Sequence, residues 1–225
     1  MEQTGHARVG HGVERWADAI GQAAVSATDA TVREGFGVGP PVVHVLVDGL
    51  DPPYVGKLLC RPFYRGGDAH EAVVVMGLFG SMLGASRLLI TYEHADMALA
   101  WEDPAADAAP TGVVVVDAAL DPGGDPAGGH TIGWYPALFT EGPTVQGRQT
   151  MATRWGPPAR YPGGRLPTAV EQLLAVWREP RPWADAAFLR VLAGWEQTGY
   201  LMRWISRPTG EQHQPRWMQL LAPIM

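Results

Sequence analysis

Several residue types are scarce in this 225-residue sequence, and each scarcity excludes a class of chemistry. Cys60 is the one cysteine, so the sequence contains neither an intramolecular disulfide nor a cysteine-based zinc or redox site. Asparagine is absent, which excludes a Cys/His/Asn triad and the reading of adenine by asparagine. A metal site in this chain would therefore use histidine and carboxylate ligands.

Lysine and long apolar runs are also scarce. Lys57 is the one lysine and the net charge is −6, so nucleic acid is disfavoured as a partner. The longest apolar run, Ala72 to Ala85, covers about 14 residues, short of the roughly 20 that a membrane-spanning helix needs. The N-terminus lacks the pattern of a secretory signal, so we expect a cytoplasmic protein without membrane contact. The richness in Ala, Gly, Pro and Arg is typical of a GC-rich bacterial genome.

The remaining pattern predicts an α+β fold with a single mixed sheet of about five strands. β-Branched and aromatic runs bounded by turn residues indicate strands. These strands are Val42–Val47, Lys57–Arg65, Arg87–Tyr92, Gly112–Leu120 and His130–Phe139. Pro62 favours an edge position for the second of them, because proline cannot donate a hydrogen bond to a neighbouring strand.

Three helical regions complete the prediction. Apolar stripes indicate an N-terminal helix over Val13–Thr31 and a C-terminal hairpin of helices over Leu166–Arg178 and Trp183–Ile205. The helix that follows Asp68 is apolar on nearly every side, so we expect a buried central helix. Its glycines, Gly77, Gly80 and Gly84, would allow close packing of a neighbour, and Asp68 with Glu71 forms an acidic capping box.

These elements suggest a domain organisation in three parts. Residues 1–140 form the α/β core with the N-terminal helix. Residues 141–166 are dense in Pro, Gly and Arg and show no periodicity, which predicts a loop. Residues 167–225 form the helical hairpin and an apolar tail packed on the core.

The segment EHAD, which follows the third strand, is the first candidate site. Residues just beyond the carboxyl end of an interior strand often line a ligand crevice. On an extended chain, His94 and Asp96 point to the same side. We therefore predict His94 as general base or metal ligand, Asp96 as the group that orients it, and Glu93 or Asp48 as an assisting carboxylate. In the alternative, Asp96 caps a following helix, and Glu93 and His94 are solvated.

A second cluster surrounds His70, in HEAVV. Val74 occupies the place of the second histidine of H-E-x-x-H, which rejects the zinc-protease interpretation. His70 is then a first-turn helical residue, although a divalent metal held by His70, His94 and Asp96 remains a candidate, because consecutive elements are usually neighbours.

Acidic residues end three of the predicted strands. Asp48 and Asp117 follow strands as Glu93 does, and these carboxylates would converge on a cation if the strands were parallel. If the strands alternate in direction, the carboxylates scatter, and aspartate then serves as a turn residue. His44, inside the first strand, is interpreted as a hydrogen-bonded core residue.

Tryptophan and methionine are concentrated near the C-terminus. Trp204 and Trp217 lie off or beyond the helical stripes, and the apolar cluster Trp217–Met225 must be buried somewhere. Such a cluster suits a protein interface, including a homodimer, and docking back on its own domain is the alternative.

Two functional hypotheses follow. The first is a noncatalytic interaction or accessory protein that oligomerises or binds a protein partner through its C-terminal region, with Trp204, Trp217 and Asp48 as binding residues. The second is a small, metal-dependent or metal-free hydrolase that uses His94 and Asp96. Because neither a G-x-S-x-G elbow nor a phosphate-binding G-x-x-x-x-G-K-[ST] motif is present, the first hypothesis is favoured.

Overall fold

The computed structural model describes residues 6–120, 129–179, 181 and 183–205. The chain divides into two units, each assembled from segments that are separate in the sequence. Unit 1 comprises Met1–Gly39, Leu89–Asp117 and His130–Gly164, and unit 2 comprises Pro40–Leu88, Ala118–Gly129 and Arg165–Met225. One unit boundary lies between Gly164 and Arg165, and the organisation in three parts stays a prediction.

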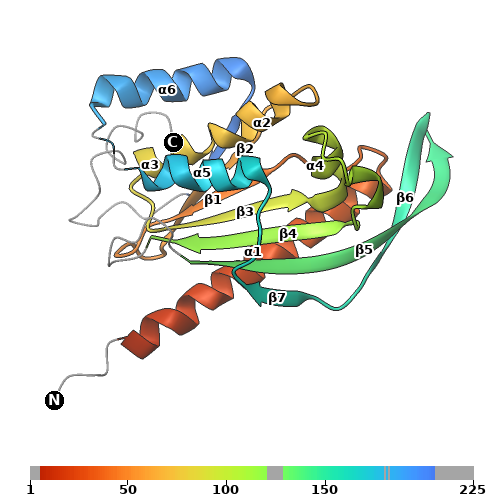
Figure 1. The fold of residues 1–225 in the computed structure, drawn as a ribbon, viewed down its shortest axis with the longest axis horizontal. Helices are drawn as coiled ribbons and strands as arrows, with labels where there is room; N and C mark the ends of the chain where they lie inside the picture. The colour runs from red at the N-terminus through yellow and green to blue at the C-terminus, as the bar shows by residue number, and fades with distance from the viewer. Residues whose placement is uncertain (1–5, 121–128, 180, 182, 206–225) are drawn as a thin grey trace. The chain divides into compact units, whose positions relative to one another are not determined.

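Unit 1 combines one long helix with antiparallel strands. Helix α1 (His6–Arg33) packs on β5 (His130–Val145) and β6 (Arg148–Trp155) (Figure 1). The strand order is β6-β5-β4-β3, where β4 is Gly112–Ala119 and β3 is Arg87–Glu93. Because β5 is long, its first part pairs with β7 (Ala159–Pro162) and its second part with β6. Helix α4 (His94–Ala100) and the short 3-10 helix η1 (Ala106–Ala108) connect β3 to β4.

Unit 2 places helices beside a three-stranded antiparallel set. Strand β2 (Tyr54–Leu59) lies between β1 (Val42–Leu46) and β8 (Leu201–Trp204). Helices α2 (Gly67–Val74) and α3 (Gly77–Met82) pack on α5 (Thr168–Arg178), and α6 (Asp185–Thr198) contacts β8 (Figure 1).

Apolar periodicity in the sequence explains most of these elements. The apolar stripes of α5 and α6 are buried, at Val170, Leu173, Leu174 and Trp177 and at Phe188, Leu192 and Trp195. Strand β3 is buried along almost its whole length, which accounts for its continuous apolar run. The α+β class, the N-terminal helix and the two C-terminal helices are therefore confirmed.

The predicted sheet needs correction. The described residues contain eight strands, so the count of about five is too low. The strand pairs are antiparallel, so the prediction of a mixed sheet is wrong. Residues 141–166, expected to be a loop, contain the end of β5 and all of β6 and β7. Their side chains are largely exposed, and this exposure leaves no apolar alternation to detect.

The second strand and the central helix also differ from expectation. Strand β2 ends at Leu59, before Pro62, and lies between two strands instead of at an edge. The central helix is two short helices joined at Val75 and Met76, where the Met76 N–H bonds three residues back to the Val73 carbonyl.

The last helix is shorter than its stripe suggests. It ends at Thr198, and Gly199 then adopts a left-handed conformation with φ 95°, which turns the chain into β8. None of the described helices combines the length and the apolar character that a bilayer-spanning segment needs.

Candidate functional site

Glu93, expected to assist catalysis, holds the start of α4 in place. It is the N-cap residue of α4, and its carboxylate accepts the Asp96 N–H at 2.6 Å. Its other oxygen accepts the N–H of Gly112, the first residue of β4, at 2.7 Å. Glu93 is only 5% exposed, and a buried carboxylate without partners would cost several kcal/mol. The capping role considered for Asp96 thus belongs to Glu93.

His94 and Asp96 do not share a side, as the extended-chain prediction required. Both lie in the first turn of helix α4, where residues two apart point in different directions. The half-buried His94 ring meets the Trp134 ring edge to face, with centroids 5.9 Å apart. The same Trp134 ring covers Gly112, where a Cβ atom would lie 2.6 Å from it. Glu93, His94, Gly112 and Trp134 therefore form one packed group, the latch cluster.

His70 belongs to another helix interface. It lies on α2, and its Nε2 atom is 2.9 Å from Gln172 Oε1 on α5. Among the residues that the structure describes, no group of three or more His, Cys, Asp or Glu side chains could hold a metal ion. The metal site of His70, His94 and Asp96 therefore gains no support from the described part of the chain.

The acidic residues at the strand ends would converge only if the strands were parallel, and the strands are antiparallel. Because β4 begins beside the end of β3, Asp117, near the end of β4, lies toward the start of β3, away from Glu93. Asp48 is exposed after β1 in unit 2, and its N–H donates to Ser86 Oγ at 2.8 Å. The strands alternate in direction, and for that arrangement we expected the three carboxylates to be scattered.

The predicted aromatic binding residues fall partly within the described structure. Trp204, on β8, packs against Phe79 of α3 with ring centroids 5.4 Å apart. It is therefore half-buried within unit 2 instead of standing free. Trp217 lies outside the described residues.

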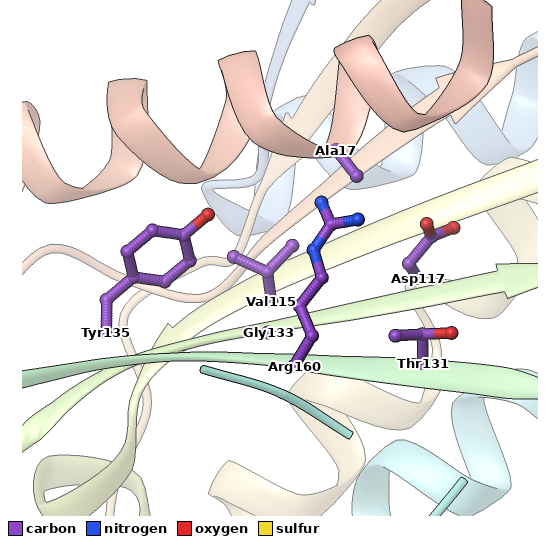
Figure 2. A pocket seen from close by; sticks show the side chains of 7 residues that line it. All are labelled: Ala17, Val115, Asp117, Thr131, Gly133, Tyr135 and Arg160. Atoms are coloured by element: carbon purple, nitrogen blue, oxygen red, sulfur yellow. The ribbon is translucent and has the colours of Figure 1, made fainter. Parts of the chain in front are cut away.

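Unit 1 contains a small cavity between α1 and strands β4, β5 and β7. Figure 2 shows the side chains of Asp117, Thr131, Tyr135 and Arg160 directed toward α1. Arg160 forms an ion pair of 2.5 Å with Asp18 on α1. Burial raises the pKa of Tyr135, with a further rise from Asp18 that Arg160 opposes.

The size of this cavity decides what it can hold. Its volume is about 10 Å³, which is about the space of one water molecule. An organic substrate does not fit, so the cavity is not a candidate active site.

A larger concavity in unit 2 is lined by the loop between β2 and α2. We call it the aromatic groove, with a volume of about 640 Å³. It is lined by Arg61, Pro62, Phe63, Tyr64, Asp68 and Thr198. The Tyr64 side chain is 85% exposed, the most exposed of the large apolar residues in the described structure.

Charged groups fix the conformation of this loop. Arg61 donates to Asp68 Oδ1 at 2.5 Å and to the Pro62 carbonyl at 2.8 Å. Asp68 also accepts the Tyr64 N–H at 2.7 Å, so Asp68 braces the loop instead of forming the predicted capping box. The hydrogen bond from Arg61 lowers the pKa of Asp68 and raises the pKa of Arg61. Burial raises the pKa of the neighbouring Cys60 thiol to about 12.

Sequence reasoning interpreted this loop as part of an edge strand and missed the groove. The run Arg61 to Arg65 places Pro, Phe and Tyr between two arginines, and arginine and aromatic residues are enriched at protein interfaces. That composition was the available signal, whereas Thr198 reaches the groove from a distant part of the sequence.

Comparison with known proteins identifies no relative. No protein-family model matches the chain, and neither a curated protein nor a solved structure gives a significant match.

Proposed function

We propose that this chain is a noncatalytic interaction protein that binds a protein partner in the aromatic groove. The observation that carries the proposal is the Tyr64 side chain, 85% exposed at the edge of a groove of about 640 Å³. Exposed aromatic and arginine side chains are enriched at the centres of protein interfaces, where they contribute most of the binding energy.

The loop that presents Tyr64 is held before any partner arrives. The Tyr64 N–H is bonded to Asp68, and Arg61 is bonded to both Asp68 and the Pro62 carbonyl. A loop fixed in this way loses little conformational entropy on binding, which favours affinity.

The polar groups of the groove favour contact over catalysis. The Arg61 and Asp68 charges neutralise each other in a direct ion pair. Cys60, which precedes Arg61, is buried and does not line the groove, and its raised pKa keeps its thiol protonated at neutral pH. What remains for a ligand is the ring of Tyr64, the neighbouring Phe63 and the pyrrolidine of Pro62.

No observation favours the hydrolase alternative to the same degree. Both carboxylate oxygens of Glu93 accept backbone N–H groups, and His94 packs on Trp134. Those contacts account for the polar cluster after β3 without a reaction. We therefore carry the interaction hypothesis forward alone.

The test is peptide selection on the immobilised full chain, followed by titration calorimetry of the selected peptides. We expect Tyr64→Ala to weaken binding at least about tenfold, the effect of losing about 1.4 kcal/mol of binding free energy. Tyr161→Ala is the matched control, because Tyr161 is also exposed, at 51%, but lies on β7 in unit 1. That control should bind as the unchanged protein does.

A self-partner is tested in the same way by sedimentation velocity. If the partner is a second copy, a concentration-dependent dimer should dissociate in Tyr64→Ala and persist in Tyr161→Ala. Selected peptides or dimers that are equally insensitive to both changes would show that the aromatic groove is not the binding site.

A further inference from the structure

We propose that the segment Trp217–Met225 of this chain docks in a second groove of unit 2, between α2, α3 and α5. This groove, the valine groove, has a volume of about 390 Å³. Its floor is made by Val74, Val75, Leu78 and Val176, all of which remain partly exposed. The proposal does not depend on the partner-binding role of the aromatic groove.

Three of the polar residues that line the valine groove, His70, Gln172 and Arg181, have partners. His70 is hydrogen-bonded to Gln172, which lies across the groove on α5. Arg181 donates to the Val176 carbonyl at 3.1 Å and forms an ion pair with Glu179. Glu71, the remaining charged residue of the lining, is exposed to solvent, so the floor of the groove offers apolar contact and favours an apolar occupant.

The segment Trp217–Met225 has these properties. Its sequence, WMQLLAPIM, contains no charged side chain and eight apolar residues of nine. Over the whole chain, by contrast, charged residues make up 18%. The side chains of Leu220, Leu221 and Ile224 match the aliphatic floor in chemistry.

The described chain ends beside α3, one of the helices that form this groove. The Ile205 N–H is bonded to the Val55 carbonyl, which fixes the end of β8. Trp204 lies against Phe79 of α3, and the next residue of that helix, Leu78, lines the valine groove. Residues 206–216 connect the two and reach up to about 36 Å when extended. This reach exceeds the width of two packed helices, about 20 Å.

Covalent connection also favours the chain's own segment over that of a second copy. Two groups that are joined through residues 206–216 of one chain meet at an effective concentration of about a millimolar. At micromolar protein concentration, the attached segment therefore occupies the groove before a second molecule does.

The test is disulfide trapping in the full chain with Cys60→Ala as background. In the first variant, Val176→Cys and Leu221→Cys place thiols in the groove and in the segment. In the matched control, Tyr64→Cys replaces Val176→Cys and puts the thiol in the aromatic groove. Because Tyr64 is 85% exposed, random collisions would favour the control pair.

We expect the Val176 pair to form an intramolecular disulfide at least tenfold faster than the Tyr64 pair at low micromolar protein. Non-reducing electrophoresis and intact mass distinguish the product from a crosslinked dimer. Equal rates, or faster trapping of the Tyr64 pair, would overturn the proposal. Crosslinked dimers would overturn it in favour of a second copy as occupant.

Hydrogen exchange provides a second measurement without cysteines. In the full chain with Leu220→Asp and Leu221→Asp, amide exchange in residues 70–78 and 172–178 should rise several-fold. Exchange in residues 61–66, around the aromatic groove, should stay unchanged. Unaltered exchange in the α2, α3 and α5 segments would contradict the docking.

Discussion

The Glu93 carboxylate accepts the Gly112 N–H at 2.7 Å and thereby joins the end of β3 to the start of β4. The same side chain caps α4 through the Asp96 N–H. One buried acid thus satisfies two backbone donors at the two ends of the α4 connection. This relationship explains why an acidic residue follows the apolar run of β3.

Glu93→Ala is expected to destabilise the fold, because it leaves both N–H groups without their acceptor. The expected loss is about 2–3 kcal/mol of unfolding free energy, which combines a lost cap and a buried unsatisfied donor. In a chain of this size the melting temperature should fall by roughly 5–10 °C. Differential scanning calorimetry measures the change, and the exposed Glu196→Ala on α6 is the control. A purely catalytic Glu93 would leave the melting temperature unchanged.

Gly112→Ala tests the other half of the latch cluster. Gly112 has φ 154°, and a Cβ atom there would lie 2.6 Å from both the Trp134 ring and the Tyr135 carbonyl oxygen. The Tyr135 contact is with the backbone of β5 and cannot be relieved without moving that strand, so we expect a loss of several kcal/mol. Gly37→Ala is a control with positive φ but no atom within 4 Å of the added Cβ. Urea unfolding should show a clearly larger loss for Gly112→Ala, and equal losses would contradict the packing argument.

His44 should make stability depend on pH. Its ring lies in β1, 3.1 Å from the Tyr54 hydroxyl and opposite Lys57, as expected for a hydrogen-bonded core histidine. Burial, and secondarily the Lys57 charge, lowers the pKa of His44 from 6.5 to about 3. Between pH 6.5 and about 3, His44 therefore binds a proton in the unfolded chain but not in the folded chain. Stability falls as the pH falls through this window, by at most about 1.4 kcal/mol per pH unit.

Urea unfolding at pH 7, 5.5 and 4.5 measures this slope. His44→Gln should flatten the slope by about the contribution of one proton, because glutamine does not titrate. His70→Gln, which retains the buried His44, should keep the slope of the unchanged protein. Parallel slopes for the unchanged protein and His44→Gln would show that another group controls acid unfolding.

The sequence predicts a helix or strand correctly where burial of the element produces a regular pattern of apolar residues. The β-branched run that begins at Val42 and the stripe of α5 fulfil this condition, because one face or the whole element is buried. Strands β6 and β7 do not, since their side chains are largely exposed. The hairpin between β5 and β6 turns at Gln146 and Gly147, both with positive φ. That Gly-containing turn was the detectable signal.

For the candidate sites, too, local features could be predicted from the sequence, whereas contacts between distant residues could not. The polar group after β3 was detectable, but its partner Gly112 lies 19 residues away, and no local pattern predicts that contact. The aromatic groove depends on Thr198 approaching the Arg61 loop, which only the fold determines. Local sequence therefore identified unusual residues, whereas their roles required non-local contacts.

Gly77 and Gly194 are both helical glycines, but their surroundings differ, so replacing each with alanine should have opposite effects on stability. A Cβ atom at Gly77 of α3 would lie 2.3 Å from the Leu173 carbonyl oxygen on α5, as expected for a glycine that permits close helix packing. At Gly194 of α6, nothing lies within 4 Å of the added atom. Gly77→Ala should therefore separate α3 from α5 and cost about 1–3 kcal/mol. Gly194→Ala should stabilise the chain by about 0.5–1 kcal/mol through helix propensity. Chemical unfolding of both variants measures the two free energies, and changes of the same sign would contradict the close approach of α3 and α5.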